Sequence, residues 1–215
     1  MIIALITVIV AYLIGSINFA VIFSSIFLKQ DVRKMGSGNA GTTNVMRNAG
    51  FLPGALTFVF DALKGFVASF IGLKTFEYLY HHISGEWTMP IYGALACGLA
   101  CMLGHVFPIF FNFKGGKGVA TSVGIFYVCN PLAITLGLTV FALVLIISKI
   151  VSLSSLIATV VVVVLSIVFY DHYAFLLPQI ILIVSMGAIV FLKHKENIKR
   201  LIAGNENKIG GKKRG

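Results

Sequence analysis

Long apolar segments alternate with short polar segments along almost the whole chain. A membrane-spanning helix needs roughly 20 mainly apolar residues, and a further apolar segment at 119–129 is shorter than that. The pattern predicts an all-α, polytopic membrane helix bundle forming one domain over residues 1–204, followed by a basic, mobile tail over residues 205–215. The segments long enough to span are 2–28, 52–80, 90–111, 132–148, 153–170 and 175–192.

The distribution of Lys and Arg decides between six and seven spans, because these residues concentrate in cytoplasmic loops. If 119–129 spans and the chain turns at Asn130-Pro131, the opposite loops hold His81, His82, Glu86 and Asp171. If 119–148 is one long kinked helix, the basic tail falls on the other side. We therefore predict seven transmembrane helices, with the N-terminus out and the C-terminus in. The basic groups that then share the inner side are Lys29, Arg33, Lys34, Arg47, Lys114, Lys117, Lys149 and the tail.

The composition supports a membrane protein and excludes several other classes. Hydrophobic residues make up 58% of the 215 residues and charged residues 11%, whereas about a quarter of residues are charged in soluble domains. The net charge of +10 is spread in short groups between apolar segments, which argues against nucleic-acid binding. The first segment lacks the basic start of a cleaved signal peptide and is predicted to be a retained helix. The three cysteines show no zinc-site spacing, so we predict no disulfide, no metal and no cofactor.

The first long polar stretch, residues 35–50, carries the residue types of an anion site. Its glycines allow successive backbone N–H groups to point at one anion, and Ser37 and Arg47 add a hydroxyl and a fixed charge suited to phosphate. The alternative is a capped turn leading into the next helix. We favour anion binding, with the further contacts Gly36, Gly38, Asn39, Gly41, Thr43 and Asn44.

A second polar stretch, residues 104–121, contains two lysines among glycines. Lys117 is followed by Gly rather than Ser or Thr, so the stretch is not a nucleotide-binding Walker motif. It is predicted to be a glycine cradle at the start of a short helix, whose N-terminus favours an anion. The alternative is ordinary lysines beside glycine hinges. The predicted contacts are Lys114, Gly115, Gly116, Lys117, Gly118 and Thr121, while His105 is expected to be a packing residue.

The third polar stretch, residues 193–206, places His194, Asn197 and Leu201 at helical spacing, so that they could share one face. The alternative is a plain basic helix next to the membrane. Asp61 and Lys64, three residues apart inside an apolar segment, can neutralise each other. They either brace the site or belong to an ion path.

These motifs, GSGNAGTTNVMR, GHVFPIFFNFKGGKGVAT and KHKENIKRLIAGNE, together resemble the bacterial glycerol-3-phosphate acyltransferases that use acyl phosphate, the PlsY family. The resemblance implies transfer of a fatty acyl group from acyl phosphate to the 1-hydroxyl of glycerol 3-phosphate, the first step of phospholipid synthesis. It places Ser37, Arg47, His194 and Asn197 at positions important for activity, the second motif at the glycerol-phosphate site, and Glu206 at a structural position.

The resemblance also implies a setting. It implies a monomer in the bacterial cytoplasmic (inner) membrane, surrounded by membrane lipid, with the acyl-phosphate-forming enzyme as a partner. The seven-span prediction puts all three polar stretches, and therefore the active site, on the cytoplasmic face.

The residue chemistry agrees with this resemblance, because both substrates carry phosphate and the three stretches are rich in donors and cations. Our hypothesis is that Arg47, Lys117 and loop amides stabilise the departing phosphate. A substrate phosphate oxygen or His194 then takes the hydroxyl proton. The competing class is a transporter of a phosphorylated solute, but transporters commonly show inverted repeats, and none is visible in the sequence.

Overall fold

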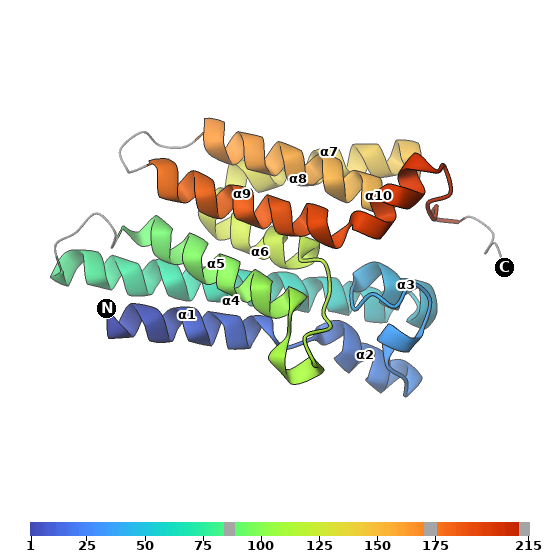
Figure 1. Cartoon of the computed structure of the whole chain (residues 1–215), viewed down its shortest axis with the longest axis horizontal. Helices are drawn as coiled ribbons and strands as arrows, with labels where there is room; N and C mark the ends of the chain where they lie inside the picture. Colours follow the sequence, from blue (N-terminus) through green and yellow to red (C-terminus); the bar gives the residue numbers. More distant parts are fainter. Residues whose placement is uncertain (84–88, 170–175, 211–215) are drawn as a thin grey trace.

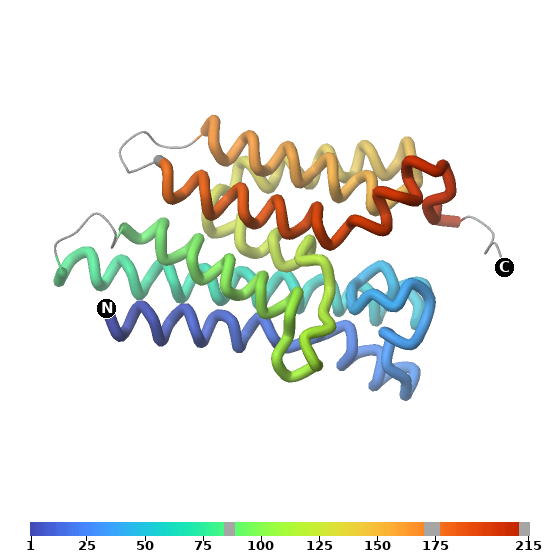
Figure 2. Tube along the Cα trace, viewed as in Figure 1, coloured from blue at the N-terminus to red at the C-terminus, as the bar shows by residue number. Residues whose placement is uncertain are grey.

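The computed structural model describes residues 1–83, 89–169 and 176–210. Within these ranges all regular structure is helical, which confirms the predicted all-α class, and the long helices lie side by side (Figures 1 and 2). Glu86 and Asp171, which the sequence assigns to outer loops, lie outside the described residues. The elements are α1 (Ile2–Gly15), α2 (Phe19–Leu28), η1 (Val32–Lys34), α3 (Thr42–Ala49), α4 (Phe51–His82), α5 (Pro90–Val106), η3 (Ile109–Phe111), α6 (Val119–Cys129), α7 (Pro131–Ser148), α8 (Val151–Val168), α9 (Leu176–Lys193) and α10 (Lys195–Ile202).

Helix α4 is the centre of the bundle, and small residues bring its neighbours close. A Cβ atom at Gly65 would lie 2.2 Å from the carbonyl oxygen of Thr121 in α6, and one at Gly124 would lie 1.8 Å from that of Ala62. Membrane helices commonly pack through such small residues. Thr121 therefore lies in the buried contact between α4 and α6.

Among the described residues, five segments are long and apolar enough to cross a membrane: Ile2–Leu28, Phe51–His82, Pro90–Phe111, Pro131–Ser148 and Val151–Val168. A sixth candidate is the pair Leu177–Lys193 and Lys195–Ile202, which is bent by 60°. Half of the eight residues of α10 are charged, so we take the apolar part to end with α9. Helix α6 is apolar but has only 11 residues, so the number seven stays a prediction.

Helices α6 and α7 form a hairpin rather than one long kinked helix. Phe126 and Ile134 line the same cavity as Val119 and Phe141, and this pairing requires the two helices to run in opposite directions. Figure 1 shows the reversal at the end of α6. The basic loops before α6 and after α7 therefore lie at one end of the bundle, as the seven-span prediction requires.

The first apolar segment, predicted as one helix over residues 2–28, is broken. Helix α1 ends at Gly15, and α2 begins at Phe19 after Asn18, whose side-chain oxygen accepts from the N–H of Val21 at 3.2 Å. The break leaves the carbonyl of Ile17 without a helical partner further along the chain. The prediction of a continuous helix is wrong because a polar cap and a charged partner stabilise the break.

That charged partner is Lys64 of α4, whose ammonium donates to the carbonyl of Ile17 at 2.7 Å. The same ammonium lies 2.8 Å from Oδ1 of Asp61, and Nδ1 of His105 lies 3.5 Å from that oxygen. All three side chains are buried. Of the two roles open to Asp61 and Lys64, the geometry favours bracing, since the pair joins the broken first helix to α4 and α5.

Candidate active site

The first polar stretch is folded around the side chain of Asn44, at the start of α3. Its amide donates to the carbonyls of Val32, Met35 and Asn39 at 3.0 to 3.1 Å. Its oxygen accepts from the backbone N–H of Ser37 at 3.1 Å. Asn44 is buried, and these bonds occupy both ends of its amide. Its side chain therefore holds the loop together and does not point at a ligand.

The loop exposes the residues predicted to meet the anion. Ser37 and Arg47 are exposed, as are Gly36 and Gly38, and both glycines have positive φ, at 53° and 69°. Such backbone conformations favour glycine. The glycines thus allow the tight turn that presents Ser37 at the surface.

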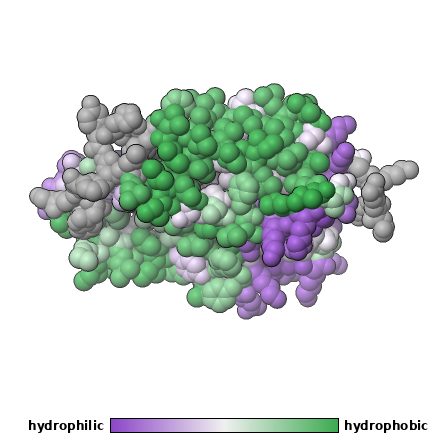
Figure 3. Space-filling view, turned by 45° about the horizontal axis from the view of Figure 1, so that its top comes forward, coloured by the Kyte–Doolittle hydropathy of each residue, from purple (hydrophilic) through white to green (hydrophobic). Residues whose placement is uncertain are grey.

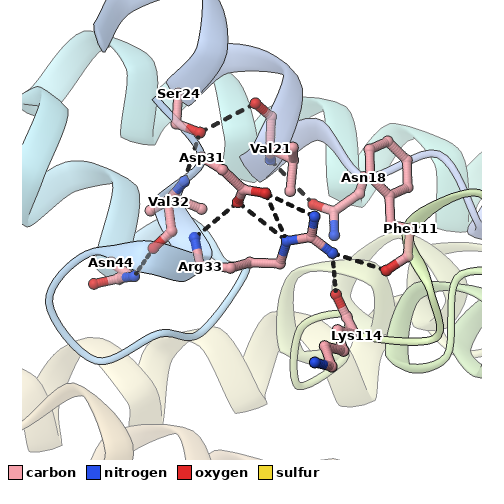
Figure 4. A network of polar contacts seen from close by, with 9 residues as sticks. All are labelled: Asn18, Val21, Ser24, Asp31, Val32, Arg33, Asn44, Phe111 and Lys114. Carbon is pink, nitrogen blue, oxygen red and sulfur yellow. Dashed lines mark hydrogen bonds and ion pairs between the residues drawn. The ribbon is translucent and has the colours of Figure 1, made fainter. Parts of the chain in front are cut away.

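Arg33, which the sequence suggested only as one of several inner-side charges, lies in η1 just before the first stretch and joins this turn to the second stretch (Figure 4). Its guanidinium forms a two-pronged pair with Asp31, at 2.7 to 3.0 Å. The same group donates to the carbonyl of Phe111 at 2.8 Å and to that of Lys114 at 3.4 Å. A clue was available in the sequence, because Asp31 is one of few acidic residues near a basic loop and is two residues from Arg33.

The second stretch lies directly against the end of α5. The N–H of Gly116 donates to the carbonyl of His105 at 3.1 Å. A Cβ atom at Gly116 would lie 2.3 Å from Nε2 of His105 and 2.6 Å from the carbonyl oxygen of Ala40, and one at Gly115 would lie 1.9 Å from the carbonyl oxygen of His105. Glycine is required here by close backbone approach. The contact with Ala40 places the first and second stretches side by side.

Lys117 connects the second stretch to the third. Its ammonium donates to the side-chain oxygen of Asn197, in the first turn of α10. The amide of Asn197 donates to Glu206 at 3.0 Å, and Arg200 donates to the other oxygen of Glu206 at 2.8 Å. Glu206 thus holds Asn197 in place, in keeping with its predicted structural role. The predicted tail begins within this network, and the N–H of Ile209 donates to the carbonyl of Lys149 at 2.8 Å.

The electrostatic environment of Lys117 is strongly positive. Burial of its ammonium lowers the pKa of Lys117 to about 8; the charge of Glu206 opposes this shift, and the charges of Arg200 and Arg47 add to it. The effect of Arg47 on this pKa places Arg47 within electrostatic reach of Lys117. A site with several cations and one neutralising carboxylate is suited to binding an anion.

His194 sits at the bend between α9 and α10, where it is buried. Its Nδ1 lies 2.8 Å from the carbonyl oxygen of Val190. A carbonyl only accepts, so Nδ1 carries the proton and Nε2 has a free lone pair. Burial and the positive charge of Lys117 lower the pKa of His194 to about 4. The imidazole is therefore neutral at physiological pH and offers an acceptor.

The structure brings most of the predicted residues to one end of the bundle. Lys117, His194 and Asn197 lie together, with Arg47 near them, and Ser37 is on the loop whose Ala40 touches Gly116. Thr121 is buried against Gly65 of α4. Figure 3 shows hydrophilic residues gathered at the end of the molecule where the loops lie, beside a largely hydrophobic face.

Known proteins resemble this one over nearly the whole chain. The family model for glycerol-3-phosphate acyltransferase matches residues 5–204. The chain is 41% identical over 205 residues to glycerol-3-phosphate acyltransferase 2 of Bacillus anthracis, covering 95% of this chain and 98% of that protein. It is 39% identical over 209 residues to the glycerol-3-phosphate acyltransferase of Thermoanaerobacter sp. (strain X514), covering 97% of each.

Two solved structures have the same fold. Both are crystal structures of PlsY (YgiH), an integral membrane glycerol 3-phosphate acyltransferase, and both are 36% identical to this chain, covering 95% of it and 94% of PlsY. The TM-score is 0.81 for the glycerol 3-phosphate form and 0.79 for the lysophosphatidic acid form. The resemblance seen in the three motifs is thus confirmed along the full chain, in both sequence and fold, and the chain belongs to the glycerol-3-phosphate acyltransferase family.

Proposed function

We propose that this protein transfers a fatty acyl group from acyl phosphate to the 1-hydroxyl of glycerol 3-phosphate, giving 1-acyl-glycerol 3-phosphate and inorganic phosphate. The observation that carries the proposal is the Lys117–Asn197–Glu206 network, which joins two loops far apart in sequence into one cationic site. The related PlsY was crystallised in a glycerol 3-phosphate form and a lysophosphatidic acid form, which are the acceptor and the acylated product of this reaction.

The phosphate groups are assigned to the cationic residues. Arg47 and Lys117 bind phosphate oxygens, and Ser37 and the backbone N–H groups of the glycine loops complete the donors. Asn44 supports this site indirectly, because its side chain forms hydrogen bonds with backbone groups of its own loop. In the reaction the acceptor oxygen bonds to the acyl carbon, the bond from that carbon to the bridging oxygen breaks, and phosphate leaves. Positive charge around the leaving group lowers the barrier.

The hydroxyl proton is assigned to a phosphate oxygen rather than to His194. A phosphate dianion, with a pKa of about 6, is a stronger base than an imidazole whose pKa is about 4. The free Nε2 of His194 instead accepts a hydrogen bond from the attacking hydroxyl and aligns it with the acyl carbon. Substitution of His194 by Gln, which accepts a hydrogen bond but takes no proton, tests this assignment. An inactive Gln variant that keeps its fold would favour His194 as the base.

The acyl chain is assigned to an apolar cavity that begins beside the site. Val119, one end of this cavity, follows the glycine loop directly, and Val190, also in its lining, accepts the hydrogen bond of His194. The cavity continues along α6, α7, α8 and α9, where nearly all of its lining is apolar. Burying an alkyl chain there is favourable, at about 25 cal/mol per Å² of apolar area. The cavity therefore places the carbonyl end of the chain near Lys117.

For the membrane setting we propose seven spans with α6 as the fourth, the N-terminus out and the C-terminus in. The basic loops at one end of the bundle support this arrangement through the positive-inside rule. The active site then faces the cytoplasm across the bacterial inner membrane. We further propose that the protein works as a monomer, receives its donor from the acyl-phosphate-forming enzyme, and needs neither metal nor cofactor.

The decisive experiment supplies the purified protein with palmitoyl phosphate and glycerol 3-phosphate, with palmitoyl-CoA as a control donor. We expect lysophosphatidic acid and phosphate to form in equal amounts from palmitoyl phosphate. Product from palmitoyl-CoA alone would contradict the proposed donor. No product from either donor, with uptake of labelled glycerol 3-phosphate by vesicles carrying the protein, would favour the transporter class instead.

A further inference from the structure

We propose that Phe126 closes the far end of the acyl cavity and thereby sets the chain length beyond which further methylene groups of the acyl chain no longer raise kcat/KM. The proposal rests on the proposed function, and on the acyl chain occupying the cavity among α6, α7, α8 and α9. It adds a specificity-determining residue that lies well away from the phosphate-binding loops.

The position of Phe126 follows from two cavities that it lines at once. The first is the proposed acyl cavity, which Phe126 enters from α6 opposite Ile134 of α7. The second is smaller and continues beyond Phe126, where Cys129 and Ser166 line it. The ring of Phe126 is thus the partition between them, and it is 3% exposed.

The distance along α6 gives Phe126 the right place for a stop. Val119 marks the end of the cavity next to the glycine loop. Phe126 follows seven residues later, which is about 10 Å along a helix. This length holds about eight carbons of an extended acyl chain, so a chain of that length that enters beside Val119 and runs along α6 ends at the ring of Phe126. A longer chain must fold back or leave the cavity sideways into lipid, and it loses apolar burial in doing so.

The second cavity is suited to receive a longer chain once the ring is removed. Its lining includes Ile91, Leu95 and Ile183, which are apolar, beside Ser166. The hydroxyl of Ser166 is buried without a hydrogen-bond partner among the described residues. Replacing Ser166 by a larger apolar residue would therefore fill this space without breaking a hydrogen bond.

The test compares kcat/KM for octanoyl, lauroyl and palmitoyl phosphate in the wild type and in Phe126→Ala. One methylene group in an apolar pocket is worth about tenfold or more in kcat/KM. We therefore expect kcat/KM for lauroyl phosphate, divided by kcat/KM for octanoyl phosphate, to rise by about tenfold in the variant. If the alanine variant is poorly folded, Phe126→Leu is a smaller change that preserves more of the packing. We expect it to shift the same ratio in the same direction. The double variant Phe126→Ala with Ser166→Leu refills the second cavity and is expected to restore the wild-type ratio.

Phe76→Leu is the matched control, because Phe76 is also buried but packs in a separate cluster with Leu79 and Tyr92. We expect it to leave the chain-length ratio unchanged. An unchanged ratio in both Phe126 variants, with activity retained, would overturn the role of Phe126. It would leave the proposed function intact, which fails only if the wild type uses no acyl phosphate of any length.

Discussion

The pKa of Lys117 leads to a pH dependence that can be worked out in advance. With a pKa of about 8, about nine-tenths of the free enzyme carries a charged Lys117 at pH 7 and about one-tenth at pH 9. The phosphate of glycerol 3-phosphate titrates near pH 6, so it stays a dianion over this range. Because only the charged lysine binds phosphate well, kcat/KM for glycerol 3-phosphate should fall about tenfold between these two pH values.

With saturating glycerol 3-phosphate, the fall in rate, which we call the high-pH limb of the profile, should occur at higher pH. A bound phosphate dianion favours the charged form of Lys117 and raises its pKa in the complex. Since kcat/KM reports the free enzyme and kcat reports the complex, kcat should fall only at a pH above the limb in kcat/KM. The assay is the initial rate of lysophosphatidic acid formation between about pH 7 and pH 10, at low and at saturating glycerol 3-phosphate.

Two variants separate Lys117 from other groups that titrate in this range. Lys117→Arg keeps a positive charge throughout, so its kcat/KM should be lower overall but show no limb near pH 8. Lys199→Gln is the control, because Lys199 is exposed and pairs with Glu196 on the outside of α10, and its profile should match the wild type. A flat wild-type profile up to pH 9, or an unchanged limb in Lys117→Arg, would refute the reasoning.

Three further predictions test the supports of the site. Gly116→Ala would place a methyl group 2.3 Å from Nε2 of His105, so KM for glycerol 3-phosphate should rise while the protein still purifies as a folded species; an unchanged KM would contradict the close approach. Arg33→Lys keeps the charge but loses the fork that joins the first two loops, and both the melting temperature and the affinity for glycerol 3-phosphate should fall, as measured by thermal unfolding with and without substrate. Lys64→Met leaves Asp61 charged and unpaired in the bundle, and the folded protein should lose about 3–5 kcal/mol of stability. In unfolding measured in detergent, the double variant Lys64→Met with Asp61→Leu should recover most of that loss. No recovery would argue against the bracing pair.

The helical elements and the polar end of the bundle were predictable because their signals are local. The length of each apolar run predicts a helix, and the Asn130-Pro131 turn together with the lysine distribution predicted the reversal between α6 and α7. The broken first helix was not predictable in this way. Asn18 is a local cap signal, but the apolar run continues on both sides of it, and the second support of the break is Lys64, which is 47 residues from Ile17.

Residue types predicted a set of side chains for the site, but not what each one does in the fold. The sequence by itself determined the three polar stretches and their suitability for phosphate, because glycine, lysine and arginine offer donors and positive charge, and the resemblance of the three motifs indicated the family. Only the tertiary structure decided that Asn44 holds its own loop, that Thr121 packs against α4, that Arg33 joins two loops and that Phe126 divides two cavities. The physical reason is that hydrogen-bond partners and cavity walls are formed by residues that are far apart in the chain but close in space. A sequence pattern does not show which distant residues meet.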